Sequence, residues 1–226
     1  PLQKPTDTIN VLWGTGFDGG QPYNSPYMDA HLLTNEATRK MMSISPNITI
    51  NLAKGLTFRS RFNYYVFQRH TYEFYPSTRP TYAAINQGAV AYRAETDEHR
   101  LTNENTLTYK NTFRRLHSVN LMVGFTVEKF TQHNFSLKGT GYLSDDIKWN
   151  NMTAIPDKNN LSPSTSLNER TRNSVLGRFN YDFKKRYYFT FTARVDGSSN
   201  FAANNKYAFF PSGAFKWMIS KEPFMK

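Results

Sequence analysis

The most regular feature of the chain is an alternation of apolar and polar residues with a period of two. It is clearest in the stretch YYFTFTARVD, residues 187–196, where aromatic or aliphatic side chains take every second position. Successive side chains of a β-strand point to opposite faces, so this pattern is typical of a strand with one apolar face. It predicts strands at 42–53, 56–68, 100–112, 116–128, 174–183, 187–196 and 207–219, with almost no helix outside the long connections.

The spacing of neighbouring strands predicts three tight hairpins. In a hairpin, the turn length must match the pairing if the apolar residues of both strands are to share one face. The pairs that satisfy this condition are Leu52–Leu56, Thr112–Leu116 and Phe183–Tyr187, with turns at 53–55, 113–115 and 184–186.

The other connections are long, at 68–100 and 129–172. Loops above about 12–15 residues are uncommon in compact domains, and here they alternate strictly with the tight turns. Short turns at one end of a sheet and long loops at the other are the pattern of an outer-membrane barrel, whose short turns are periplasmic and whose long loops are extracellular.

The arginines of the predicted strand at 56–68 indicate which face meets lipid. Arg59 and Arg61 lie two positions apart and so share a face. An arginine that faces lipid at the middle of the bilayer costs about 2–4 kcal/mol. We therefore expect the face rich in Arg, Asn and Thr to line the lumen, and the face rich in Phe, Leu and Val to contact outer-membrane lipid.

The composition narrows the classes of function. The chain has 226 residues, no cysteine and a formal net charge of +11. The absence of cysteine excludes disulfides, cysteine–zinc clusters and thiol catalysis. Basic residues occur in ones and twos, opposite the aromatic face, so we expect no nucleic acid as a partner. The chain contains no apolar run long enough for a transmembrane helix and opens on PLQKPTDT, without Met or an apolar leader, so we expect a mature product or a piece of a longer protein.

Residues that could carry chemistry do not form a recognisable site. The histidines are scattered, and none has metal-ligand spacing. The glycine-rich stretch Trp13–Gly20 lacks the lysine and the strand–helix context of a phosphate loop. Asp145 and Asp146 are expected to be solvated, and Asp196–Ser199 is not a nucleophile elbow. We predict no catalytic residue, no metal and no cofactor, and an enzyme is the weakest of the functional hypotheses.

Residues 174–226 closely resemble a signature stretch of the SusC/RagA family, the TonB-dependent outer-membrane importers of Bacteroidetes. The patterns S-x-x-G-R-x-N-Y, R-x-D-G-S-S-x-F, F-P-S-x-x-x-x-W and E-x-F follow one another in the family's order, with Asn200 where the family often has Arg. The matching residues are Ser174, Gly177, Arg178, Asn180, Tyr181, Arg186, Tyr187, Arg194, Asp196, Gly197, Ser198, Ser199, Phe201, Phe210, Pro211, Ser212, Trp217, Glu222 and Phe224.

The resemblance implies an all-β fold, an antiparallel transmembrane β-barrel segment of about seven strands from a larger barrel, usually of about twenty-two. Residues 1–226 would be part of a TonB-dependent receptor β-barrel, with the plug and N-terminal domains outside this chain. The implied function is active import of a glycan or peptide across the outer membrane. The implied partners are a SusD-like lipoprotein that acts as a lid, and TonB, which acts through regions absent here. Asp196–Ser199 would be the extracellular end of a strand and its turn.

Recognition of the substrate is expected in the two long loops, because loops on a rigid scaffold gather binding residues. The same side chains could instead pack the loops or meet the lipoprotein, so the substrate-binding residues stay unknown. A soluble β-sandwich that binds carbohydrate is the alternative function. The candidates are Tyr72, Phe74, Tyr75, Arg79 and Tyr82 in one loop, and Tyr142, Asp145, Asp146 and Trp149 in the other.

Overall fold

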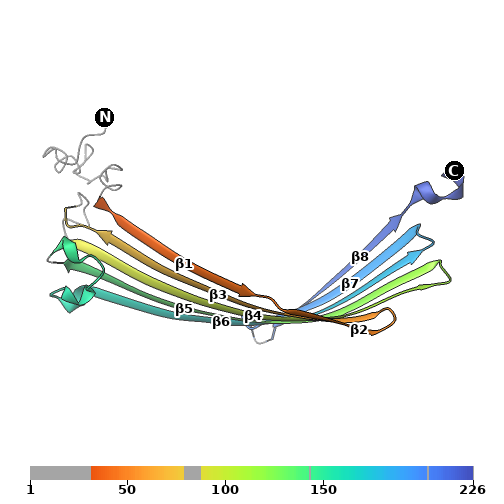
Figure 1. Ribbon diagram of the computed structural model, residues 1–226, viewed down its shortest axis with the longest axis horizontal. Helices are drawn as coiled ribbons and strands as arrows, with labels where there is room; N and C mark the ends of the chain where they lie inside the picture. Colours follow the sequence, from red (N-terminus) through yellow and green to blue (C-terminus); the bar gives the residue numbers. More distant parts are fainter. Residues whose placement is uncertain (1–31, 79–87, 143, 203, 226) are drawn as a thin grey trace. The chain divides into compact units, whose positions relative to one another are not determined.

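The computed structural model describes residues 32–78, 88–142, 144–202 and 204–225. Their strands form one antiparallel sheet in the order β1-β3-β4-β5-β6-β7-β8, with β2 also paired to β3 (Figure 1). No helix among these residues is long and apolar enough to cross a membrane. The strands are β1 (Thr34–Ile44), β2 (Asn47–Ala53), β3 (Leu56–Tyr75), β4 (Ala89–Phe113), β5 (His117–Tyr142), β6 (Leu161–Phe183), β7 (Tyr187–Ser198) and β8 (Tyr207–Trp217). The short 3-10 helices are η1 (Asp145–Ile147), η2 (Met152–Ala154), η3 (Lys158–Asn160), η4 (Ile219–Lys221) and η5 (Pro223–Met225).

The predicted strand at 42–53 is two strands in the structure. β1 and β2 are separated by Ser45 and Pro46, and both pair with β3. Proline has no backbone N–H and cannot donate to the ladder. Its carbonyl still accepts a hydrogen bond from the Phe62 backbone N–H at 3.0 Å, so the chain resumes pairing directly after the interruption.

The two predicted long loops are wrong in extent, because strands occupy most of them. β3 and β5 run further than expected, to Tyr75 and Tyr142, and β4 and β6 begin earlier, at Ala89 and Leu161. The added stretches hold polar residues on both faces, as at Asp97 and Glu98, so the contrast that marks a strand is missing there. The connections that remain are 76–88 and 143–160.

The hairpin of β6 and β7 has the predicted register, with Phe183 opposite Tyr187. The other two predicted pairings are wrong by a small shift. Ala53 lies opposite Leu56, so the β2–β3 turn is Lys54-Gly55 and Leu52 falls in a bulge. Gly55 takes the left-handed conformation that this turn requires, with φ +79°.

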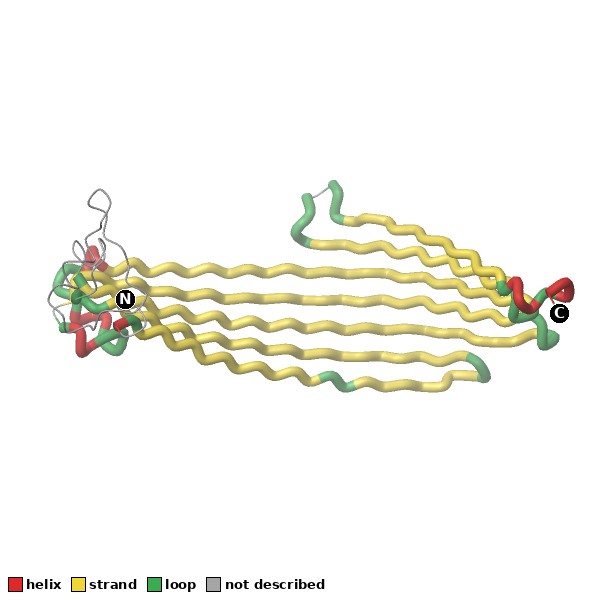
Figure 2. The backbone as a smooth tube through the Cα atoms, turned by 90° about the horizontal axis from the view of Figure 1, so that it is seen from above, coloured by secondary structure: helices red, strands yellow, loops and turns green. Residues whose placement is uncertain are grey.

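The turn after β4 lies one residue later than predicted. It spans 114–116 and is closed by a hydrogen bond of 3.1 Å from the Leu116 N–H to the Phe113 carbonyl. Moving both ends of a turn by one residue leaves the parity of the paired positions unchanged, so the predicted faces survive. Figure 2 shows this turn beside those of β2–β3 and β6–β7.

The chain divides by its contacts into two compact units, each described here by itself. The loop unit comprises the described residues within Pro1–Met41, Phe67–Asp97 and Gln132–Leu167. The turn unit comprises the described residues within Met42–Val66, Glu98–Thr131 and Asn168–Lys226.

The loop unit has a hydrophobic core between its strands and the connection 144–160. Met152 and Ile155 of this connection are buried with Phe74 of β3, Ala89 and Ala91 of β4, and Tyr142 of β5. Gly139 provides the space, because a Cβ there would lie 2.5 Å from Ile155 Cδ1. The connection is therefore packed against the sheet.

The turn unit exposes both faces of its sheet. In β6, β7 and β8, Tyr181 lies opposite Phe189, which lies opposite Phe215, and the last two ring centroids are 4.9 Å apart. The large apolar side chains of this unit's apolar face are exposed among the described residues. They include Leu107, Leu121, Val123, Phe125, Val175, Phe179, Phe189, Phe191, Phe209 and Phe215.

A buried carboxylate fixes the segment that follows β8. Glu222 is 6% exposed and accepts hydrogen bonds from Tyr187 Oη at 2.7 Å and Trp217 Nε1 at 3.0 Å. Its other oxygen pairs with Arg186 Nη1 at 3.1 Å. The Met218 N–H also donates to the Arg186 carbonyl at 2.8 Å. Residues 218–225 are thus attached to the β6–β7 turn and to the first residue of β7.

Candidate functional site

The segment Asp196–Ser199 differs from the predicted turn, because β7 continues through Ser198. Asp196 lies opposite Ser174 of β6 and Ala208 of β8. Its carboxylate accepts both bonds from Arg194 Nε, at 2.6 and 2.8 Å. The connection to β8 begins at Ser199.

Gly197 and Ser199 hold this end of three strands together. A Cβ at Gly197 would lie 2.5 Å from the Tyr207 ring of β8, so only glycine leaves room for that ring. The Thr171 N–H donates to Ser199 Oγ at 2.9 Å, and the Ser199 N–H donates to the Thr171 carbonyl at 2.9 Å. The motif therefore joins β6, β7 and β8.

Several aromatic loop candidates turn out to be packing residues. Phe74 and Tyr142 are 3% and 7% exposed and meet edge to face, with ring centroids 6.4 Å apart. Burial raises the cost of ionising the Tyr142 hydroxyl, which has no hydrogen-bond partner in the described residues. Tyr75 donates to Glu73 Oε2 at 3.1 Å. Phe74 and Tyr75, predicted in a loop, lie in β3, and Tyr142 is the last residue of β5.

The carboxylates of the second loop also have local partners. Asp145 accepts hydrogen bonds from the Ser77 backbone N–H at 3.0 Å and from Ser77 Oγ at 3.0 Å, which ties the two connections together. The Asp146 carboxylate accepts a hydrogen bond from Ser144 Oγ at 3.4 Å, and the Asp146 N–H donates to the same hydroxyl oxygen at 3.3 Å, so this serine caps η1. Arg79, Tyr82 and Trp13–Gly20 lie outside the described residues.

Tyr72 and Trp149 form an aromatic pair on the loop unit. Their rings stack with centroids 5.6 Å apart, and both are half-buried. The Arg93 guanidinium lies 5.6 Å from the Tyr72 centroid and pairs with Glu95 at 2.7 Å. Tyr72, like Phe74, belongs to β3 and not to the predicted loop. Unlike Phe74 and Tyr142, which are buried, this pair is half-buried and lies beside a guanidinium group.

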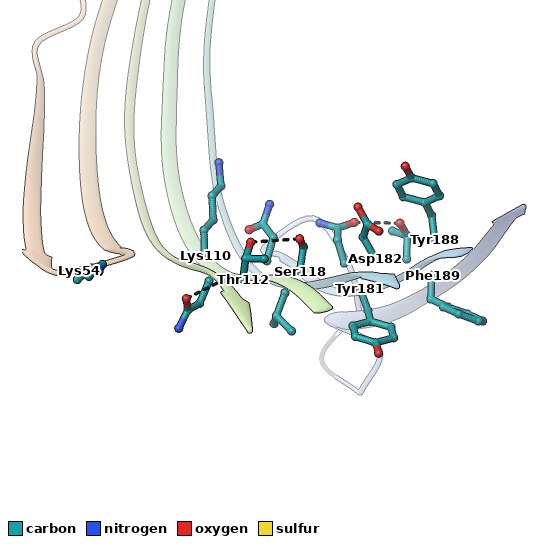
Figure 3. A pocket seen from close by; sticks show the side chains of 13 residues that line it. Lys54, Lys110, Thr112, Ser118, Tyr181, Asp182, Tyr188 and Phe189 are labelled. Carbon is teal, nitrogen blue, oxygen red and sulfur yellow. Dashed lines mark hydrogen bonds between the residues drawn. The ribbon is translucent and has the colours of Figure 1, made fainter. Parts of the chain in front are cut away.

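Figure 3 shows the alternation of faces near the tight turns of the turn unit. Lys110, Thr112, Ser118, Asp182 and Tyr188 point to one side, and Tyr181 and Phe189 to the other. A pocket of about 510 Å³ lies here, and its lining includes the hydroxyl pair of Thr112 and Ser118, 3.2 Å apart, and the hydrogen bond from Thr190 to Asn180 at 2.9 Å. Sequence reasoning predicted the faces here but not the pocket.

In the described parts of the chain, no three His, Asp or Glu residues lie close enough to hold a metal ion. Three of the described histidines make polar contacts, each with a different residue. His99 bonds to Tyr64 at 3.0 Å, His117 to Tyr181 at 2.7 Å, and His70 lies 3.7 Å from Glu95.

The curated proteins that resemble this chain are TonB-dependent receptors. No family model matches the chain. TonB-dependent receptor P3 of Formosa agariphila is 33% identical over 225 residues, which is 98% of this chain and 21% of the relative. TonB-dependent receptor SusC of Bacteroides thetaiotaomicron is 38% identical over 107 residues, 47% of this chain and 10% of the relative. The chain spans about a fifth of the length of the first of these curated relatives.

Solved structures share the fold. The RagAB peptide transporter superposes with a TM-score of 0.77 at 21% identity, over 93% of this chain and 23% of that chain. A closed state of the RagAB peptide importer gives a TM-score of 0.76 at 22% identity. At this identity the likeness concerns the fold alone.

Proposed function

Since the chain is a homologue of the TonB-dependent receptors of the SusC/RagA family, we propose that it forms part of an outer-membrane barrel that imports a nutrient. The nutrient is a glycan or a peptide, and the energy for import comes through TonB. Residues 1–226 contribute strands to the barrel wall, and the plug and N-terminal domains belong to other parts of the polypeptide.

The observation that carries this proposal is the contrast between the two faces of the turn unit. Phe189 and Phe191 are 46% and 53% exposed, which is unfavourable in water for a whole face of such residues. On the opposite face, Arg178 bonds to Thr192 and Thr190 to Asn180. Lipid against the first face would cover its exposed aromatic side chains, and water against the second would solvate its polar side chains, as in the wall of a transmembrane barrel.

The free edges of the sheet support a larger barrel. Among the described strands, β8 pairs only with β7, and β1 and β2 pair only with β3. A lipid bilayer offers no hydrogen bonds to an open edge, so further strands must continue the sheet on both sides. The soluble β-sandwich is disfavoured, because the described strands form a single sheet and a sandwich requires two.

The proposed function also implies two protein partners, a surface lipoprotein and TonB. We assign the face of the loop unit to a SusD-like lipoprotein, which acts as a lid and receives the substrate, and we assign the contact with TonB to other parts of the receptor. The packed connection 144–160 supports this assignment, because a surface held by Met152 and Ile155 is preorganised for docking.

Cell fractionation and uptake test the proposal. We expect the full-length protein in the outer membrane, as a band whose gel mobility changes on heating, and we expect uptake of its nutrient to be lost in cells without TonB. Replacing residues 144–160 by a short glycine–serine linker should abolish lid binding and uptake while the heat-modifiable band remains. Recovery of the full-length protein in the soluble fraction, or uptake that is independent of TonB, would contradict the proposal.

A further inference from the structure

We propose that the polar face of the turn unit binds the carboxylate or sulfate groups of an acidic oligosaccharide. The site is a row of alternating aromatic and guanidinium groups, the Arg–aromatic row, which consists of Tyr65, Arg100, Phe130 and Arg170. The inference names the substrate class of the importer and therefore rests on the function proposed above.

The row crosses four neighbouring strands, from β3 to β6. The Arg100 guanidinium carbon lies 5.7 Å from the Tyr65 ring centroid and 5.5 Å from that of Phe130. The Arg170 guanidinium carbon lies 4.1 Å from the Phe130 centroid on β5. Phe130 is only 5% exposed, so the side chains around it, both guanidinium groups among them, cover its ring. Stacking uses the face of a guanidinium and leaves the N–H groups in its plane available to an anion.

The hydrogen-bonding capacity of the two arginines is not used up. Arg100 Nη2 bonds to Glu98 at 2.9 Å, but Arg100 Nε has no partner. The Arg170 side chain has no hydrogen bond or ion pair within the described residues, and its Nε is buried without an acceptor. A buried donor without a partner costs about 1–3 kcal/mol. Within the described residues, the Arg170 guanidinium contacts the Phe130 ring and has no carboxylate partner, so a ligand oxygen at its N–H groups would add an interaction that it lacks here.

Four arginines lie in or beside the row, namely Arg61, Arg100, Arg170 and Arg172, against the three carboxylates of Glu98, Glu104 and Glu128. Two further arginines flank it, and their ion pairs are long, with Arg61 3.9 Å from Glu104 and Arg172 3.8 Å from Glu128. Beside Arg100 lies a groove of about 350 Å³, and its walls also include Asn63 and Thr102. Loose pairs of this kind can exchange a partner for a ligand at little cost, because exposed ion pairs contribute about 0–1 kcal/mol.

The walls of the groove favour a saccharide over a peptide. All the lining side chains are charged, amide or hydroxyl groups: Arg61, Asn63, Arg100, Thr102, Glu104 and Glu128. Such groups match sugar hydroxyls and acidic substituents, whereas a peptide of mixed sequence also needs apolar surface for its side chains. Arginine is well suited to carboxylate and sulfate, because it can donate two parallel hydrogen bonds to one anionic group.

Binding to the purified full-length receptor tests the inference. The probes are oligomers of galacturonate and of chondroitin sulfate, a neutral maltooligosaccharide and a glutamate-rich peptide, measured by calorimetry at several salt concentrations. We expect at least one acidic saccharide to bind, with an affinity that falls as salt rises. Arg170→Gln should weaken that binding about tenfold, the effect of one charge-assisted hydrogen bond. Arg170→Lys should restore it only in part.

Lys184→Gln is the matched control, because it removes the same charge from an exposed turn of the same unit, away from the row, and it should bind like the wild type. The inference is overturned if Arg170→Gln binds normally, if no acidic saccharide binds the folded receptor, or if the glutamate-rich peptide or the neutral saccharide binds equally well. These outcomes concern the row alone. Failure of the import function would appear separately, as loss of the heat-modifiable band or of TonB-dependent uptake.

Discussion

Glu222 shows how one residue fixes a segment that has little secondary structure of its own. The pKa of Glu222 is lowered, chiefly by the hydrogen bond from Tyr187 and then by the one from Trp217. The charge of Arg186 acts in the same direction. A lowered pKa in the folded state means that the carboxylate stabilises the fold above the pKa of an unfolded glutamate. This stability is lost as the pH falls through the lower, folded pKa.

We therefore predict that residues 218–225 stay attached at neutral pH and loosen in acid below the usual range of a glutamate. Glu222→Gln should loosen them at neutral pH and remove the pH dependence, because it keeps the shape but not the charge. Hydrogen exchange of this segment in the full-length protein measures both effects. Equal exchange in wild type and variant across the pH range would show that Glu222 does not fix the segment.

In the loop unit, Gly139 allows the connection 144–160 to pack against the sheet. A Cβ there would approach Ile155 Cδ1 at 2.5 Å and Met152 Cε at 3.2 Å. We predict that Gly139→Val destabilises the packed connection 144–160 by about 1–3 kcal/mol, the usual cost of overpacking. Protease cleavage within 144–160 should become faster. Gly213→Ala is the control, because no atom lies within 4 Å of the Cβ it adds. Equal cleavage in the two variants would remove Gly139 from this account.

At the scale of elements, the apolar face was predictable and the strand ends were not. Periodicity identifies β7 well, because Phe189 and Phe191 contrast with Thr190 and Thr192. The contrast is weaker where β3 and β4 extend beyond the predicted strands, because polar residues occur on both faces there. Tyr72 and Phe74 were therefore expected in a loop. Pro46 was a readable signal that was missed, since proline interrupts a ladder wherever its N–H is required.

The candidate site was less predictable, because its contacts join residues far apart in the sequence. Asp145 was expected in solvent, and only the fold brings Ser77 to it. The stacking of Arg170 on Phe130 likewise depends on the register of β5 and β6. A residue type can indicate which interaction it prefers, but its partner is set by strand pairing.

The two faces of β7 should respond very differently to an added charge. We predict that Phe191→Arg costs about 2–4 kcal/mol, the cost of arginine facing lipid near the midplane. Thr192→Arg should be tolerated better, because Thr192 lies on the opposite, polar face, where an added guanidinium can stay hydrated although the hydrogen bond from Arg178 is lost. The assembled, heat-modifiable fraction of each full-length variant reports the difference. Similar assembly of the two variants would contradict the assignment of the faces.

At the scale of the whole molecule, the two compact units differ in how their connections are held. In the turn unit, short turns are bonded to the neighbouring element, as when the Lys184 N–H donates to the Leu116 carbonyl at 2.7 Å. In the loop unit, longer connections enclose a core that includes Ile155. The turn unit is thus closed by short hydrogen-bonded turns, and the loop unit by connections that form a packed core.

The central claim is that one face of this sheet meets lipid and the other a water-filled lumen. The most direct test uses single cysteines at 189, 190, 191 and 192 in a full-length protein without other cysteines. Residues 1–226 contribute none. In intact outer membranes, a membrane-impermeant thiol reagent should label positions 190 and 192 and spare 189 and 191. Stronger labelling at the two phenylalanine positions, or equal labelling at all four, would contradict the account.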